Sequence, residues 1–291
     1  MGEFLPSMEV QGVASASGAR AVERALGVMA MVAKGGGTGI SLADVVRDTG
    51  LNKPTARRLL IALIRSRLVE QDDATRRYHL GPELYVLGML AAPRHGLLDM
   101  ATESLQRLSG ISGDTSFVSM RRGDYAVCLH RQEGNHPVRT HALLAGDQNP
   151  LGVGAGSLAM LAALADDEAG AVLQRVEDTI CAQYRGYTSE ILRLDIQQAR
   201  ERGYALNPGR VIASSWGIGM PILLPNGRLA GALSIAAIDS RMTQPRQQEL
   251  ASLLSEEVSR IQAKLQRLFK DHASDAGTVQ HKVSLKADVP A

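Results

Sequence analysis

Residues 41–68, SLADVVRDTGLNKPTARRLLIALIRSRL, have the pattern of two short helices joined by a tight turn. Ser41 is placed to cap the first helix, and Gly50 tolerates the left-handed backbone that ends it. Asn52 can cap the second helix, where Pro54 fits the first turn. Apolar residues recur at helical spacing in this second helix, at Leu59, Leu60, Leu63 and Ile64. The segment therefore predicts a helix-turn-helix.

The other side of the second helix is predicted to be basic. Between Asn52 and Arg67 there are five basic residues and no acidic one: Lys53, Arg57, Arg58, Arg65 and Arg67. A helix that is apolar on one side and basic on the other suits a DNA groove. Similar patterns and solvated basic faces also occur in proteins that do not bind DNA, so the segment alone leaves both interpretations open.

The residues that follow favour DNA binding. Residues 68–71 and 76–80 contain β-formers and flank the turn-prone residues 72–75, which predicts a hairpin. A hairpin directly after such a helix is a wing, and its arginines can reach phosphates beside the groove. The predicted DNA contacts are Ser41, Asn52, Lys53, Thr55, Arg57, Arg58, Arg76 and Arg77.

Length and charge indicate a small DNA-binding domain joined to a larger one. The 291 residues suffice for about two domains, and residues 20–95 contain 12 basic and 7 acidic residues, against 20 and 21 in 96–291.

Cys128 and Cys181 lie far apart without a CxxC spacing, which argues against a metal ribbon or disulfide scaffold and fits a reducing cytoplasm. No apolar run approaches the ~20 residues of a membrane span. We expect a soluble, cytoplasmic protein without a membrane partner.

Five segments are expected along the chain. They are a flexible leader over 1–18, the winged helix-turn-helix over 19–80, a linker helix over 81–95, a mixed domain over 96–270 and a polar, disordered tail over 271–291. The first helix of the DNA-binding domain is expected over 20–34. Because Leu84, Tyr85, Leu87 and Leu90 would be exposed in a simple linker, we expect them to contact a second subunit.

The mixed domain is predicted to be α+β. Helices are expected over 97–108, 157–164, 168–176, 190–202 and 244–269, and strands over 115–121, 125–131, 138–144, 217–224 and 228–238. Consecutive hairpins followed by helices favour an antiparallel sheet covered by helices.

Several motifs in this order resemble the IclR-type bacterial transcriptional regulators over residues 20–269. SLADVVRDTGLNKPTARRLL is similar to the helix-turn-helix of that family, and RRYHLGPELYVLG to its wing and the start of its linker helix. RERGYAL and LAGALSIAA look like motifs of its effector domain. The resemblance implies a GAF-like effector domain and a homodimer or homotetramer that binds double-stranded operator DNA under the control of a small molecule.

The same resemblance implies a set of effector-binding residues. By position they are His141, Ala155, Gly156, Asn207, Ser215, Gly217, Ser234 and Ala236. The chain departs from the family at Ser157 and Leu158, where glycine and lysine are usual. Gly152, Gly154 and Gly156 precede a helix, so backbone amides there can approach an anion, although tight helix–sheet packing also explains such glycines. An organic or aromatic acid is the expected effector.

Neither metal nor enzymatic chemistry is indicated by the remaining polar residues. His130, His136 and His141 lie near Cys128, but strand alternation separates some of them and no close ligand pair occurs, so we expect no metal and no cofactor. Ser157 lacks a GxSxG turn, and no acidic pair lies on the predicted rim, so no enzyme is expected. The alternatives are a ligand-binding sensor that acts on protein partners and a DNA-associated metabolic enzyme.

Overall fold

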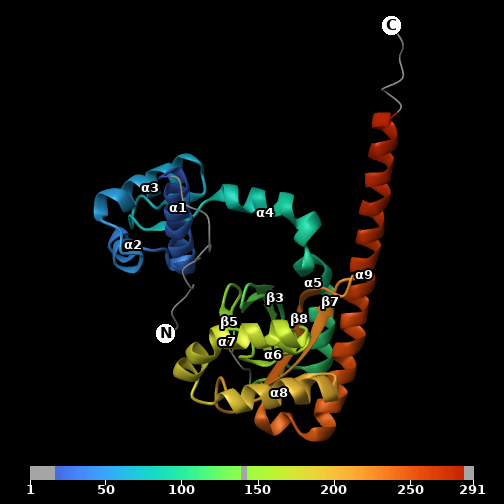
Figure 1. Cartoon of the computed structure of the whole chain (residues 1–291). Coiled ribbons are helices and arrows are strands. Elements are labelled where there is room, and N and C mark those ends of the chain that lie inside the picture. The colour runs from blue at the N-terminus through green and yellow to red at the C-terminus, as the bar shows by residue number, and fades with distance from the viewer. Residues whose placement is uncertain (1–16, 139–142, 285–291) are drawn as a thin grey trace. The chain divides into compact units, whose positions relative to one another are not determined.

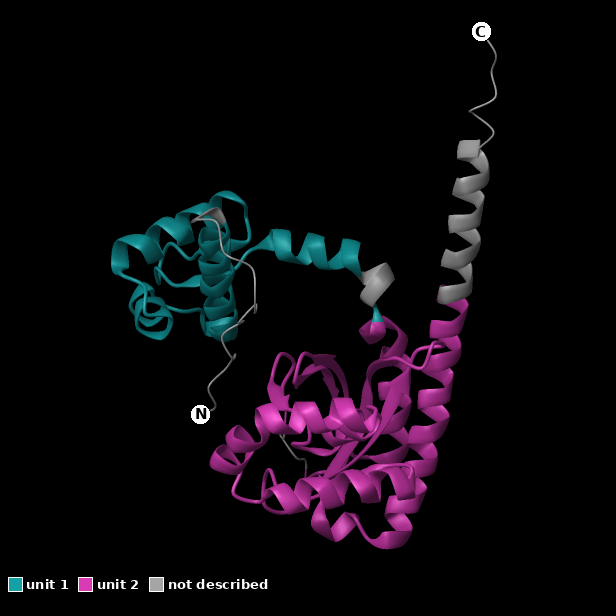
Figure 2. Cartoon of the chain, viewed as in Figure 1, with its two compact units in different colours: residues 1–96 teal, residues 97–291 magenta. Residues whose placement is uncertain are grey.

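The computed structural model describes residues 17–138 and 143–284, and the chain divides into two compact units, residues 1–96 and 97–291 (Figure 2). The division falls one residue after the predicted end of the linker helix. Each unit has a hydrophobic core of its own.

The first unit is a winged helix-turn-helix followed by a helix (Figure 1). Its elements are α1 (Ser17–Lys34), η1 (Gly36–Thr38), α2 (Leu42–Thr49), α3 (Lys53–Arg65), β1 (Val69–Gln71), β2 (Tyr78–Leu80) and α4 (Pro82–His95). Strands β1 and β2 form the antiparallel wing. The predicted helix-turn-helix and its hairpin are confirmed, and α1 begins at Ser17, inside the segment expected to be a flexible leader.

Local capping sets the bounds of the two central helices. The Ser41 hydroxyl accepts a hydrogen bond from the Asp44 N–H at the start of α2, and the Asp44 carboxylate accepts one from the Ser41 N–H, which forms a capping box. The Ser41 hydroxyl also donates to the Asp44 carboxylate at 2.6 Å, and this bond lowers the pKa of Asp44. Gly50 ends α2 with φ +67°, and the Asn52 side chain caps α3 by accepting from the Thr55 N–H.

The buried side of α3 packs on α1, α2 and the wing. Ala56, Leu60 and Leu63 are fully enclosed, while Leu59 and Ile64 are half-buried at the edge of the same core. The predicted apolar stripe is therefore the packing side of this helix.

The second unit is built on a six-stranded antiparallel sheet in the order β5-β4-β3-β8-β7-β6. Its strands are β3 (Thr115–Arg122), β4 (Tyr125–Gln132), β5 (Gln148–Pro150), β6 (Ala205–Pro208), β7 (Ser215–Leu223) and β8 (Leu229–Ile238). Its helices are α5 (Leu97–Ser112), α6 (Ala155–Ala162), α7 (Asp166–Gln183), α8 (Ser189–Arg202) and α9 (Gln244–Ser284), with η2 (Asp239–Arg241) before the last.

Helices cover both faces of this sheet, as Figure 1 shows. Helices α5 and α9 pack on one face over residues such as Ile218 and Leu233, and α6, α7 and α8 form the core on the other side. The residues that alternate with Ile218 and Leu233 therefore face α6. The predicted α+β fold with an antiparallel sheet is confirmed.

Some predicted elements differ from the structure. The strand expected over 138–144 is not seen at its described residues Val138, Leu143 and Leu144, and its centre, including His141, lies outside the described residues. The paired strand is β5, a few residues later, and β6 was not predicted at all.

The tail was predicted to be disordered from residue 271, whereas α9 continues to Ser284. The polar sequence after Phe269 ends the apolar stripe, but polar residues such as Lys and Gln are compatible with helix, and no proline occurs between Pro245 and Pro290. Residues 285–291 lie outside the described part of the chain.

Candidate functional site

The exposed side of α3 forms a basic surface in the first unit. A shallow, open groove along it is lined by Lys53, Pro54, Arg57, Arg58, Ile61, Ala62 and Arg65. Arg57 and Arg58 are both exposed, and Pro54 and Ile61 lie on the same side of the helix as Arg57 because three or four residues make one turn. Four cations beside small apolar patches give a surface that can approach phosphates and base edges.

The two predicted arginines of the wing have different surroundings. Arg76, at φ +58°, has an exposed side chain whose guanidinium lies 3.7 Å from the Asp73 carboxylate. Arg77 instead donates from Nε and Nη2 to the carbonyl of Gly39, at 3.2 and 3.1 Å. The Arg77 guanidinium therefore ties the wing to the segment after η1, which a sequence pattern does not reveal.

Three of the other predicted DNA-contact residues lie around the helix starts. Ser41 and Asn52 use their side chains as helix caps, and Thr55 is half-buried in the first turn of α3. The side-chain oxygens of Ser41 and Asn52 therefore accept hydrogen bonds from the backbone of this unit, and Thr55 supplies the N–H that Asn52 caps. Lys53, beside the Asn52 cap, is exposed.

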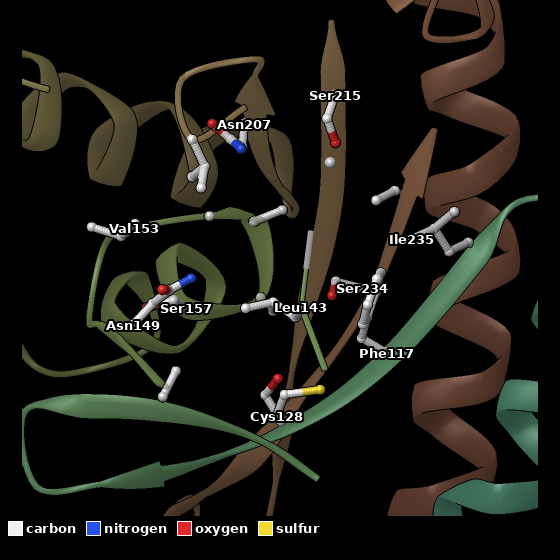
Figure 3. A pocket seen from close by; sticks show the side chains of 18 of the residues that line it. Phe117, Cys128, Leu143, Asn149, Val153, Ser157, Asn207, Ser215, Ser234 and Ile235 are labelled. Atoms are coloured by element: carbon white, nitrogen blue, oxygen red, sulfur yellow. The ribbon is translucent and has the colours of Figure 1, made fainter. Parts of the chain in front are cut away.

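The second unit contains a partly open cavity of about 50 Å³ between the sheet and the start of α6 (Figure 3). Its walls come from all six strands of the sheet, the first turn of α6, and the segments before α6 and after β6. The lining residues include Phe117, Ser119, Ala126, Cys128, Leu143, Asn149, Val153, Gly154, Ala155, Gly156, Asn207, Ser215, Trp216, Gly217, Ser234 and Ala236.

Seven of the eight residues predicted to bind an effector line this one cavity: Ala155, Gly156, Asn207, Ser215, Gly217, Ser234 and Ala236. Strand pairing brings them together, because Asn207 is opposite Gly217, which is opposite Ala236 on the next strand. The eighth, His141, lies outside the described residues. Sequence reasoning missed Phe117, Cys128 and Asn149, although the first two occupy inward positions of predicted strands.

Glycines allow α6 to approach the sheet closely. A Cβ at Gly219 would lie 2.7 Å from the carbonyl oxygen of Ala155, and one at Gly156 would lie 3.2 Å from the Ser234 hydroxyl. Both glycines therefore serve helix–sheet packing. Gly156 also lines the cavity, so this one residue lets α6 pack closely on the sheet and leaves its backbone open to a ligand.

The start of α6 faces the cavity with its positive end. Gly154 is its N-cap, at φ +85°, and no side chain caps this helix. The hydroxyl of Ser157 does not serve the cavity, because it donates to the Pro150 carbonyl and accepts from the Gly152 N–H. The backbone at residues 155 and 156 is therefore the part of the helix start that a ligand can approach.

The polar side chains around the cavity are neutral. Figure 3 shows the hydroxyls of Ser215 and Ser234 and the amides of Asn149 and Asn207 around the same space. Among the described lining residues, Cys128 has the one ionisable side chain, and burial raises the pKa of its thiol to about 12. The cavity can therefore offer hydrogen bonds without a fixed side-chain charge.

The described residues contain neither a metal-binding cluster nor a membrane-spanning helix. Within residues 17–138 and 143–284, no group of three or more His, Cys, Asp or Glu side chains is arranged to hold a metal ion. The helices within these two ranges are each too short or too polar to span a bilayer.

The helix α4 exposes large apolar side chains. Tyr85 and Leu90 are each 74% exposed, and Val86, Leu87 and Met89 are about half exposed. Leu84, the fourth residue predicted to be exposed there, is half-buried. A contiguous apolar surface of this kind is typical of a protein–protein contact.

Both units match models of known domain families. Residues 21–73 match the IclR helix-turn-helix domain, and residues 89–263 match the domain described as bacterial transcriptional regulator IclR C-terminal.

Characterised relatives include two regulators. The HTH-type transcriptional repressor AllR of Escherichia coli K12 is 29% identical over 232 residues, which cover 79% of this chain and 84% of AllR. The HTH-type transcriptional regulator BhcR of Paracoccus denitrificans is 25% identical over 235 residues, covering 81% and 83%.

Solved structures share the fold. A putative IclR transcriptional regulator from Silicibacter sp. TM1040 has a TM-score of 0.71 at 24% identity, covering 84% of this chain and 96% of its own. An IclR homologue of Microbacterium hydrocarbonoxydans, in complex with 4-hydroxybenzoate, has a TM-score of 0.68 at 21% identity, covering 84% and 99%.

Proposed function

Because this chain belongs to the IclR family of bacterial transcriptional regulators, we propose that α3 contacts operator DNA and that a small organic acid in the cavity controls this binding. The chain is a DNA-binding transcriptional regulator. The finer assignment rests on one observation: seven residues from separate parts of the sequence surround a single cavity beside the uncapped start of α6. We assign binding and no reaction to this cavity, and we place the protein in the cytoplasm with the DNA it binds.

The chemistry of the cavity favours an acid. Hydroxyl and amide donors, together with the positive end of a helix, stabilise a carboxylate without a charged side chain. The start of α6 supplies backbone N–H groups, and Ser215, Ser234 and Asn207 supply side-chain donors.

The size of the cavity favours a small acid. A volume of 50 Å³ is small, since about 10–15 Å³ is already the least space that holds one water molecule. The Microbacterium homologue is in complex with an aromatic acid, 4-hydroxybenzoate. Of the two expected classes, the proposal selects the smaller aliphatic acids, and an aromatic acid would require the walls to move apart.

The exposed side of α3 is the proposed DNA-binding surface. Arg57 and Arg58 lie at the middle of the exposed side of α3, with Lys53 and Arg65 toward its ends. We propose that Arg57 reads base edges and that Arg58, turned about 100° further round the helix, lies closer to the phosphate backbone.

A homodimer is part of the proposal. The exposed apolar side chains of α4 would be covered by the same helix of a second copy. A two-fold dimer reads an inverted repeat, so each subunit would contact one half-site. Pairing of dimers into tetramers through the second unit is proposed on the family resemblance alone.

DNA binding can be tested with the region upstream of the protein's own gene. We expect wild type to shift this DNA, and Arg57→Ala to weaken binding by ~1–3 kcal/mol, the cost of one good base contact. The double variant Arg57→Ala/Arg58→Ala should bind more weakly still. Arg121→Ala, an arginine of β3 in the second unit, is the matched control. If the folded double variant bound the DNA as tightly as wild type, the proposal that α3 contacts DNA would be wrong.

A further inference from the structure

Tyr187 lies behind the cavity wall, in the segment between α7 and α8, and is only 4% exposed. Its hydroxyl oxygen accepts a hydrogen bond from the N–H of Gly154, the N-cap of α6, at 2.9 Å. The same hydroxyl lies 3.4 Å from the amide oxygen of Asn207, to which it donates. Tyr187 therefore connects the start of α6 with a side chain that lines the cavity.

The direction of these bonds fixes the orientation of the Asn207 amide. The N–H of Arg210 also points at the Asn207 atom that faces Tyr187, at 3.3 Å. A backbone N–H can only donate, so this atom is the amide oxygen and not the nitrogen. Since the oxygen accepts two bonds from the protein, the NH2 group is the end of Asn207 that remains for the cavity.

The phenol ring is itself held in place. The Arg210 guanidinium lies 5.9 Å from the ring centroid and pairs with the buried carboxylate of Asp195 on α8. Burial raises the pKa of Tyr187 to about 12, so the hydroxyl keeps its proton at any ordinary pH. The Tyr187 hydroxyl can therefore donate to the Asn207 amide oxygen throughout this pH range.

A second tyrosine of the same segment repeats the arrangement. Tyr184 packs edge-to-face on Tyr187, with ring centroids 6.2 Å apart, and its hydroxyl donates to the amide oxygen of Asn149 at 3.2 Å. Asn149 lines the cavity beside the start of α6. Both cavity asparagines are thus held through their oxygens.

We propose that Tyr187, assisted by Tyr184, is a positioning residue that turns the asparagine NH2 groups toward the cavity and so makes it select ligands that accept hydrogen bonds. This inference rests on the proposed effector role of the cavity. The oxygens of a carboxylate can accept hydrogen bonds from the asparagine NH2 groups. An amidinium has the same shape but carries only N–H donors, so it cannot accept these bonds. An unmatched buried polar group disfavours the wrong ligand, and a tenfold or larger preference for the acid follows.

The test compares matched pairs of probes by calorimetry and thermal shift on the full-length protein. The pairs are acetate with acetamidine and 4-hydroxybenzoate with 4-hydroxybenzamidine, with pyruvate as a further small acid. Wild type should bind at least one carboxylate at least tenfold more tightly than its amidine. Tyr187→Phe keeps the ring but removes the hydroxyl, so carboxylate affinity should fall about tenfold and the preference should shrink.

Two further variants separate positioning from general destabilisation. Tyr204→Phe, whose ring packs on the α5 and α9 side of the sheet, should bind like wild type. Asn207→Asp keeps the shape but replaces the NH2 donor with an acceptor, so the preference should move toward the amidine. A simple loss of folding would instead weaken both members of a pair equally.

The outcomes distinguish the two proposals. If wild type binds none of the three carboxylates, the proposed acid effector is contradicted, and the inference fails with it. If wild type binds a carboxylate and folded Tyr187→Phe keeps the same affinity and the same preference, the effector role stands and the positioning role of Tyr187 is wrong.

Discussion

Two neighbouring arginines of the wing differ in what their guanidinium groups contact. Arg77 bonds to a backbone carbonyl of its own unit, whereas Arg76 is exposed and near only an exposed carboxylate. The sequence places both in the hairpin and predicts the same contact for both. The difference comes from the position of Gly39, 38 residues away, which only the tertiary structure defines.

Separate substitutions should therefore have separate effects. Arg76→Ala should weaken binding to all DNA sequences alike and reduce the salt slope by about one, since one phosphate contact is lost. Arg77→Ala should lower the free energy of unfolding of the first unit by about 1 kcal/mol, because the Gly39 carbonyl loses its donors. DNA titrations at several salt concentrations and urea unfolding measure the two effects. Equal salt slopes for Arg76→Ala and wild type would contradict the assignment of Arg76.

The two capping residues show which contacts spacing along the chain can predict. The sequence predicted Ser41 and Asn52 both as caps and as DNA contacts, and the structure contains the caps. A cap is a local interaction between residues three apart, so spacing alone predicts it. A contact with a partner depends on what remains exposed after folding, which spacing does not determine.

Among the elements, length decided which ones could be predicted. The longer strands β3, β4, β7 and β8 have eight to ten residues each, form two hairpins around turn-prone residues, and were each predicted within about two residues. Edge strands β5 and β6 have three and four residues, too few for a period-two pattern, so they were missed. These short strands nevertheless place Asn149 and Asn207 in the cavity wall, so two of its polar groups lie where sequence patterns are least informative.

The exposed apolar side chains of α4 should hold two copies of the chain together. Leu90→Asp should convert the proposed dimer to a monomer at micromolar concentration, because a carboxylate would be buried in an apolar contact without a partner. Leu194→Asp, at a half-exposed leucine of α8, is the control and should leave the dimer intact. Light scattering after size exclusion, without DNA, gives the mass directly. A wild-type monomer, or a Leu90→Asp dimer of unchanged stability, would contradict the role of α4.

Across the whole molecule, the two proposed sites lie in different units. The basic side of α3 belongs to the first unit and the cavity to the second, and the chain passes between them through α4 and Gly96. An acid in the cavity affects DNA binding only if it binds one state of the protein more tightly than another. A typical coupling of ~1–3 kcal/mol would change operator affinity about 5- to 150-fold.

Occupation of this cavity by an acid should control the affinity of the protein for DNA. The most direct measurement is fluorescence anisotropy of the upstream DNA, titrated with wild type and with Gly156→Leu, each with and without the carboxylate that binds wild type most tightly. The leucine side chain would fill the space beside Ser234. We predict that the acid changes the affinity of wild type at least fivefold and that Gly156→Leu, folded and still binding DNA, shows no change. A Gly156→Leu protein that responds to the acid like wild type would show that the effector binds elsewhere.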